Sequence, residues 1–144
     1  MEHVLTPAKK EETMYTLQLP SRVESINRLE NFIESLREAY HIGEDTFANI
    51  LVATTEAVNN AITHGNKLDE KKTVYVNLEV ENKSKLHFTI ADEGAGFDYD
   101  SLPDPTLPEN LEKPCGRGVF IMRQLSDQFI VNKKGTEIEL LFKI

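Results

Sequence analysis

Hydrophobic and polar residues alternate in five short stretches of this chain, and each stretch therefore predicts a half-buried β-strand. These stretches are residues 15–19, 74–80, 86–90, 129–132 and 136–144. Pro20 ends the first. The other four are neighbours in pairs, separated by short polar turns that are typical of β-hairpins. The pattern therefore favours a sheet that is mostly antiparallel.

Apolar residues recur every three to four positions in three further stretches, which predict α-helices. These are residues 23–36, 44–64 and 119–126. Ser21 and Glu24 match a capping box before the first helix, and Gly65 ends the second. Because the helices and the hairpins are segregated along the chain, we expect an α+β fold, a two-layer sandwich whose mixed, mostly antiparallel sheet carries the helices on one face.

Two segments lack this periodicity. Residues 1–12 are charged and predict a flexible N-terminal arm, which leaves residues 13–144 as a single domain. Residues 98–115 include four prolines and form a long predicted loop. Because loops of this length in compact domains commonly cover a functional site, we interpret it as a lid.

The composition is that of a globular protein of one domain. The 144 residues include 16 Lys and Arg against 24 Asp and Glu, a net charge of −8. This excess of acid argues against direct nucleic-acid binding, which depends on clustered basic residues, and favours protein or small-molecule partners. The sequence has no apolar run near the roughly 20 residues that span a bilayer and no signal sequence, so we expect a cytoplasmic protein without membrane contact. The single cysteine, Cys115, excludes an internal disulfide, and no zinc-site spacing occurs.

Polar side chains follow one face of the second predicted helix. Glu56, Asn60 and His64 are spaced by one helical turn and so lie along the same face. A carboxylate can accept a proton from an attacking hydroxyl, and an amide oxygen can bind Mg²⁺, which suits phosphoryl transfer. Taken alone, the spacing also fits a solvated polar face.

Two glycine-rich segments adjoin the ends of predicted elements. Residues 92–97, Asp-Glu-Gly-Ala-Gly-Phe, follow a strand, where a backbone without side chains can approach a ligand and a carboxylate can accept a hydrogen bond from an exocyclic amine. Residues 116–118, Gly-Arg-Gly, open the short third helix, whose free N–H groups would attract phosphate. Neither segment matches the glycine motif of dinucleotide-binding domains, and no P-loop pattern occurs in the chain.

These motifs, in this order, resemble those of one known family. They are Glu-x-x-Asn-Asn-x-x-x-His-Gly at 56–65, Asp-x-Gly-x-Gly-Phe at 92–97, Gly-x-Gly at 116–118 and Gly135-Thr136. Together they resemble the N box, the two glycine boxes and the closing Gly-Thr of the GHKL ATP-binding superfamily, which has the Bergerat fold. The chain is most similar to bacterial anti-sigma factor serine kinases, and the resemblance extends from Met14 to Ile144.

The resemblance implies a role for each matching residue. Glu56 would activate the substrate hydroxyl, Asn60 would bind Mg²⁺, and Asp92 would bond the adenine amino group. Arg117 would supply positive charge at the phosphates. The nucleotide-binding residues implied in this way are Asn59, Asn60, Asp92, Gly94, Gly96, Phe97, Gly116, Gly118 and Thr136. His64 matches the motif, and we interpret it as structural.

The resemblance predicts an ATP- and Mg²⁺-dependent serine/threonine-protein kinase. It would phosphorylate a serine of an anti-anti-sigma factor of the STAS type and sequester a sigma factor, in a family whose members are commonly homodimers. Some members carry an arginine two residues before the second glycine box, where this chain has Pro114. Either Arg117 supplies that charge or transfer is slow. Two alternatives stay open: a non-catalytic ATP-binding partner-switch module, which Pro114 favours, and a stand-alone catalytic domain of the histidine-kinase type.

Overall fold

A computed structural model defines the fold over residues 11–96 and 117–144. The strands are β1 (Glu12–Pro20), β2 (Thr73–Glu81), β3 (Lys85–Ala91), β4 (Gln128–Asn132) and β5 (Glu137–Lys143). The helices are α1 (Ser25–Ala39), α2 (Glu44–Asn60) and α3 (Arg117–Leu125). A π-helical turn, η1 (Ala61–Gly65), extends α2, and a 3₁₀ turn, η4 (Lys133–Gly135), joins β4 to β5. The elements follow the predicted order.

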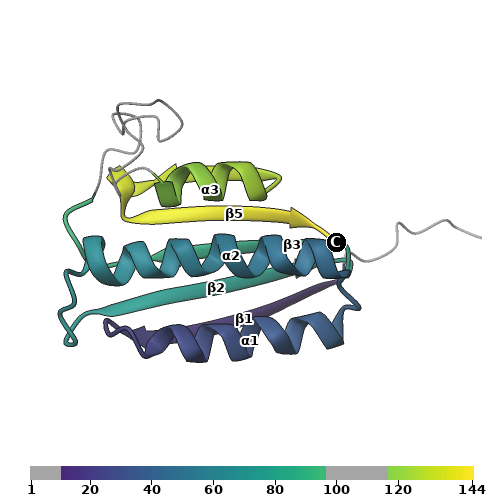
Figure 1. Ribbon diagram of the computed structural model, residues 1–144, viewed down its shortest axis with the longest axis horizontal. Coiled ribbons are helices and arrows are strands. Elements are labelled where there is room, and N and C mark those ends of the chain that lie inside the picture. The colour runs from purple at the N-terminus through teal and green to yellow at the C-terminus, as the bar shows by residue number, and fades with distance from the viewer. Residues whose placement is uncertain (1–10, 97–116) are drawn as a thin grey trace, which may run out of the picture.

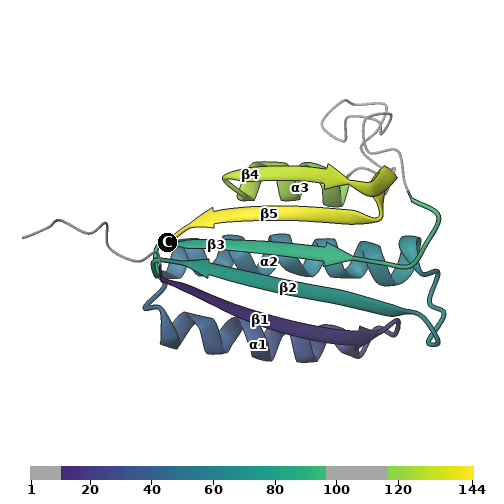
Figure 2. The same ribbon diagram turned by 180° about the vertical axis from the view of Figure 1, so that it is seen from behind.

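The five strands form one sheet in the order β1-β2-β3-β5-β4, and all four pairings are antiparallel. The three helices lie on one face of this sheet, and the opposite face carries no helix among the described residues (Figures 1 and 2). We call the latter the helix-free face. The predicted two-layer α+β fold is confirmed. Within the described ranges, no helix has both the length and the apolar character needed to cross a membrane.

Alternation along the strands decides which side chains enter the core. Even-numbered residues of β2, β3 and β5 are buried against the helices, namely Val74, Val76, Leu78, Val80, Leu86, Phe88, Ile90, Ile138, Leu140 and Phe142. From the helix layer, buried positions of α1 and α2 complete the cluster, among them Leu29, Ile33, Ile50 and Ala57. Each large apolar side chain contributes about 1.5–3 kcal/mol on burial, so this shared core is what holds the two layers together.

Helix α1 begins differently from the sequence prediction. The helix starts at Ser25, and Glu24 at its N-cap makes no side-chain capping bond. Ser21 instead donates its hydroxyl hydrogen to the carbonyl of Lys72 at 2.7 Å. The predicted capping box is therefore wrong, because Ser21 is used to join the end of β1 to the loop before β2.

Asn66, directly after the π-helical turn, ties three segments together. Its side chain is completely buried, at 0% exposure. The amide group donates to the Ser21 hydroxyl at 2.9 Å and to the Thr73 carbonyl at 3.1 Å, and the amide oxygen accepts the backbone N–H of Glu93 at 2.7 Å. These bonds fix the end of the long helix against the start of β2 and against the loop that follows β3.

We expect Asn66→Ala to lower the free energy of unfolding by about 2–4 kcal/mol, because it leaves partly buried backbone groups at Thr73 and Glu93 without this partner. Urea unfolding would measure the loss. Asn77→Ala, a matched change on the helix-free face of β2, serves as the control. A loss at Asn66 no larger than at Asn77 would contradict the role of Asn66 as a clamp.

Candidate functional site

Helices α2 and α3 meet at a glycine. Gly118, in the first turn of α3, packs on α2 so closely that a Cβ placed on it would lie 2.7 Å from Glu56 Oε2 and 3.0 Å from Asn60 Nδ2. Glu56 and Asn60 are one helical turn apart, and both are partly exposed. The missing side chain at Gly118 therefore leaves the space in which the carboxylate and the carboxamide lie together.

Asp92 lies against the end of the same long helix. A Cβ on Gly65 would overlap the Asp92 carboxylate, and a Cβ on Gly94 would overlap the carbonyl of Gly65. The Asp92 Oδ1 atom also accepts the backbone N–H of Gly94 at 2.8 Å. Gly65 ends the π-helical turn that follows Asn60 directly. One short turn therefore connects the Asp92 carboxylate with the Glu56–Asn60 pair.

The turn before β5 forms another side of this region. The carbonyl of Thr136 accepts the backbone N–H of Asp92 at 2.9 Å, and the Thr136 hydroxyl donates to the carbonyl of Lys133 at 3.0 Å. Gly96 has a φ of +96°, and a Cβ there would overlap the carbonyl of Lys134. Glycine at position 96 therefore satisfies both a left-handed backbone and a close approach of two loops.

The structure thus brings together predicted site residues from four separate stretches of sequence. They are Glu56, Asn60, Asp92, Gly94, Gly96, Gly118 and Thr136. Asn59 lies exposed on α2 beside Asn60, Arg117 lies exposed at the start of α3, and His64 is exposed on the π-helical turn. The other positions singled out from the sequence, Phe97, Pro114, Cys115, Gly116 and the predicted lid 98–115, lie outside the described residues.

The electrostatic environment of Asp92 distinguishes it from the exposed acids. Burial raises the pKa of its carboxyl above the usual value, although the N–H of Gly94 and the charge of Lys72 oppose this effect. An ionised carboxylate that is partly desolvated is a strong acceptor for a ligand N–H donor. The side chain is therefore suited to bind an amino group that enters between the glycine segments.

Asn60 could bind a metal ion only with the help of further ligands. Among the described residues, no group of three or more His, Cys, Asp or Glu side chains could hold a metal ion. Mg²⁺ at phosphoryl-transfer sites commonly takes one or two protein oxygens and completes its shell with water and substrate phosphates. The single amide oxygen of Asn60, a partly exposed residue near the start of α3, fits a Mg²⁺ ion that arrives with a nucleotide.

Sequence reasoning missed the residues that position this site. Gly65 was predicted to end a helix and to close the motif at 56–65, but its contact with the Asp92 carboxylate is a tertiary feature that no local pattern indicates. Asn66 was not singled out, and an asparagine after a helix carries no sequence signal that distinguishes a buried clamp from an ordinary helix end. The influence of Lys72 on Asp92 likewise depends on the folded loop.

Comparisons with known proteins agree with this geometry. Residues 19–142 match the family model described as histidine kinase-like ATPase domain. An anti-sigma F factor of Geobacillus sp. strain WCH70 is 36% identical over 103 residues, which cover 67% of this chain and 68% of that protein. The serine-protein kinase RsbW of Staphylococcus aureus RF122 / ET3-1 is 25% identical over 134 residues, covering 88% of this chain and 83% of that protein.

Two solved structures share the fold. A Mycobacterium tuberculosis structure that contains RsbU and RsbW domains superposes with a TM-score of 0.63 and 13% identity, covering 91% of this chain and 32% of that one. The histidine kinase domain of a blue-light activated kinase from Erythrobacter litoralis gives a TM-score of 0.51 and 20% identity, covering 87% of this chain and 60% of that one. At these identities the likeness concerns the fold alone.

We expect Asp92→Asn to raise the melting temperature of the unliganded protein at neutral pH. The raised pKa means that the folded state holds the ionised Asp92 carboxylate less favourably than the unfolded state does, whereas a neutral amide can still accept the Gly94 N–H. The gain should shrink as the pH falls toward 3.8, the usual pKa of the group, because the parent carboxyl then becomes protonated in the fold.

Thermal unfolding at several pH values would measure this gain. Asp69→Asn, the same chemical change in an exposed loop, is the control and should give no comparable gain. If Asp92→Asn is less stable than the parent at neutral pH, or if its advantage grows on acidification, the interpretation of Asp92 fails.

Proposed function

We propose that this chain, which belongs to the histidine kinase-like ATPase domain family, is an ATP-dependent protein serine kinase of the anti-sigma factor type. The observation that carries the proposal is the convergence of Glu56 and Asn60 on Gly118, next to Asp92 against Gly65. One region therefore offers a base, a metal ligand and an acceptor for a purine amino group. The relatives named as anti-sigma F factor and serine-protein kinase support the same activity.

In this proposal the nucleotide binds across the glycine segments. Its adenine amino group donates to the Asp92 carboxylate, with Gly94 and Gly96 beside the base and Thr136 supporting it. The phosphates extend toward Gly118 and the exposed Arg117 at the N-terminal end of α3, where free backbone N–H groups and the guanidinium favour negative charge. Asn59, Phe97 and Gly116 complete the proposed binding residues.

The position of Glu56 suits it to act as the base in phosphoryl transfer to a serine. Its carboxylate accepts the proton of a serine hydroxyl, the hydroxyl oxygen forms the new bond to the γ-phosphorus, and the bond to ADP breaks in line. Asn60 would hold Mg²⁺, which when bound neutralises phosphate charge. Because phosphoryl transfer has a loose transition state, the main contribution of these residues is to position the reacting groups.

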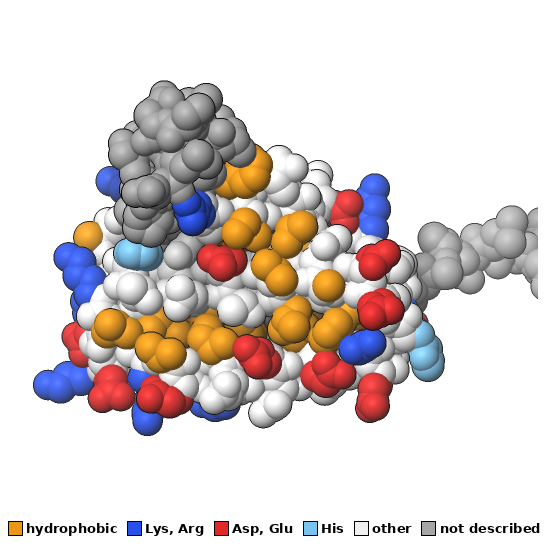
Figure 3. All heavy atoms as spheres, in the orientation of Figure 1, with side chains coloured by type: hydrophobic (Ala, Val, Ile, Leu, Met, Phe, Trp, Pro, Cys, Tyr) orange, Lys and Arg blue, Asp and Glu red, His pale blue; other side chains and the backbone are white. Residues whose placement is uncertain are grey.

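The surroundings of Glu56 support a protein as the phosphoryl acceptor. Val52, one helical turn before Glu56, is 42% exposed, and Phe120 on α3 is 37% exposed. Apolar side chains are visible over α2 and α3 on this face (Figure 3). Exposed apolar groups beside a proposed catalytic base suit a protein surface that must present its serine there.

We assign the acceptor to an anti-anti-sigma factor of the STAS type. Adding a phosphate dianion to its surface would weaken the complex, after which the kinase, as a homodimer, would hold a sigma factor instead. A second candidate is a non-catalytic ATP-binding partner switch, which is favoured by Pro114 at a position where some relatives carry a charge-neutralising arginine.

Incubation with Mg·ATP and a candidate STAS protein tests the proposal. Glu56→Gln should lower transfer by about 10²- to 10⁴-fold, because the carboxylate base is lost, while ATP affinity stays close to that of the parent. Intact mass of the partner would reveal one added phosphoryl group per serine. Glu30→Gln on α1 is the matched control and should transfer normally. Tight ATP binding by the parent without any transfer would favour the partner switch.

Gly118→Ala should separate folding from catalysis. Alanine is about 1 kcal/mol better than glycine inside a helix, so the fold should persist. The added Cβ would nevertheless displace Glu56 and Asn60, and we expect transfer to fall by at least about tenfold. Gly43→Ala is the control, since a Cβ there meets nothing within 4 Å. Equal transfer rates for the two variants would show that the Gly118 contact is not used.

A further inference from the structure

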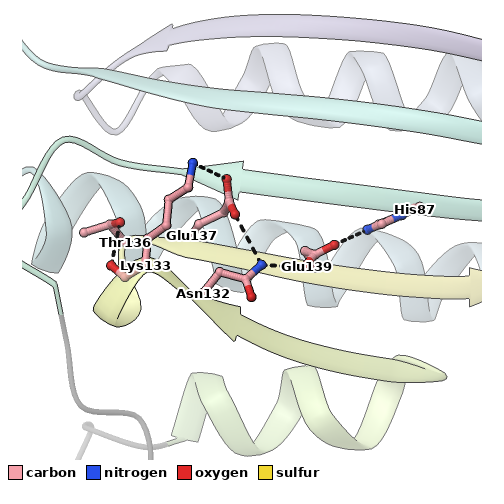
Figure 4. Close-up of polar contacts among 6 residues, drawn as sticks. All are labelled: His87, Asn132, Lys133, Thr136, Glu137 and Glu139. Atoms are coloured by element: carbon pink, nitrogen blue, oxygen red, sulfur yellow. Dashed lines mark hydrogen bonds and ion pairs between the residues drawn. The ribbon is translucent and has the colours of Figure 1, made fainter.

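A connected set of polar side chains crosses strands β3, β5 and β4 on the helix-free face (Figure 4). Its members are His87, Glu139, Asn132, Glu137 and Lys133. His87 Nε2 lies 2.6 Å from Glu139 Oε1. Asn132 Nδ2 donates to Glu139 Oε2 and, at 3.2 Å, to Glu137 Oε2. The proposed phosphoryl transfer uses none of these side chains.

This network ends on the turn that precedes Thr136. Lys133 Nζ lies 3.3 Å from Glu137 Oε1. Lys133, Lys134 and Gly135 have φ values of 52°, 56° and 89°, so two lysines in succession adopt the left-handed region. That conformation is unfavourable for residues with a Cβ and persists where surrounding contacts enforce it. The N–H and the hydroxyl of Thr136 both donate to the carbonyl of Lys133 and close the turn, and the ion pair with Glu137, whose lysine is largely exposed, adds a weaker contact.

The same turn also contacts the segment that carries the proposed adenine-binding residues. The carbonyl of Lys134 lies against Gly96, and the carbonyl of Thr136 accepts the Asp92 N–H at 2.9 Å. A shift of the turn would therefore move both the first glycine segment and the proposed adenine-binding carboxylate. The polar network is thus connected through a few bonds to the groups that would contact the base.

The turn also sets the direction of the Thr136 hydroxyl. That hydroxyl donates its only hydrogen to the Lys133 carbonyl at 3.0 Å, so toward a ligand its oxygen can act only as an acceptor. The Asp92 carboxylate is an acceptor as well. Two acceptors suit the 6-amino group of adenine and do not suit the 6-oxo group of hypoxanthine, which is itself an acceptor.

We propose that Asn132 is a positioning residue for adenine selection: its bonds to Glu137 and Glu139 fix the 133–135 turn and thereby orient Thr136 and Asp92. The inference rests on the proposed function, because it requires a purine nucleotide in this site. The side chains of Glu137 and Glu139 are only 17% and 21% exposed, so their bonds to Asn132 are partly shielded from water.

The charge arrangement explains why an amide is needed at position 132. Glu137 and Glu139 project from the same face of β5, and the Asn132 amide donates to both of their carboxylates. Bonds from Asn132 and His87 lower the pKa of Glu139, which keeps that carboxyl ionised. A third carboxylate in place of the amide would repel both and would release the turn.

The test compares ATP with inosine triphosphate (ITP), which differs at the 6-position of the base. We expect the parent to prefer ATP and Asn132→Asp to reduce the ATP-to-ITP affinity ratio by about tenfold. Gln128→Glu, the same amide-to-acid change on the helix-free face of β4, should leave the ratio unchanged. Lys133→Met removes only the ion pair and should shift the ratio in the same direction by a smaller factor, which provides a milder variant if Asn132→Asp does not fold.

Calorimetric titration of both nucleotides, with melting temperatures measured alongside, separates the outcomes. A fall in melting temperature with an unchanged ATP-to-ITP ratio in both Asn132→Asp and Lys133→Met would show a merely structural role and would overturn the inference. A ratio that falls equally in Gln128→Glu would also overturn it. If the parent binds neither nucleotide, the proposed function fails and the inference fails with it.

Discussion

At Gly65, Gly94 and Gly118 neighbouring atoms lie so close to the backbone that an added Cβ would overlap them, and the site depends on this steric constraint. At two of these positions the neighbour is a polar side chain of the site itself: the Asp92 carboxylate at Gly65, and the Glu56–Asn60 pair at Gly118. Glycine therefore does more here than allow flexible loops. It brings three carboxylate and amide groups from distant parts of the sequence into one region.

The two-layer core and the site are stabilised by different kinds of interaction. Alternating apolar residues of the sheet pack against α1 and α2, and this burial fixes where α2 ends relative to β3. Beyond those ends the chain is held by polar bonds, chiefly those of Asn66 and of the turn before Thr136. Burial raises the pKa of the Asp92 carboxyl, as expected for a group that is placed for a ligand rather than for stability.

Features that follow from local periodicity or from a sequence motif could be predicted from the sequence. The strands, the helices and the order of elements follow from apolar spacing, and the convergence of Glu56, Asp92 and Gly118 agrees with their assignment to one set of motifs. Ser21 was assigned to the wrong role, because its partner Lys72 is 51 residues away and only the fold brings them together. Asn66 could not be found for the same reason. The roles assigned to the site residues remain predictions, and Phe97 and Gly116 also lie outside the described residues.

The number of residues in the π-helical turn affects how the two parts of the site are placed relative to each other. The N–H of Asn66 donates to the carbonyl of Ala61, five residues earlier, where a regular α-helix would use the fourth. The widened turn accommodates one residue more than an ordinary α-helical turn, so a deletion that restored regular winding would leave one residue fewer between Asn60 and Gly65, the glycine that lies against the Asp92 carboxylate. The number of residues in this interval, and not only their side chains, therefore decides which residue meets Asp92.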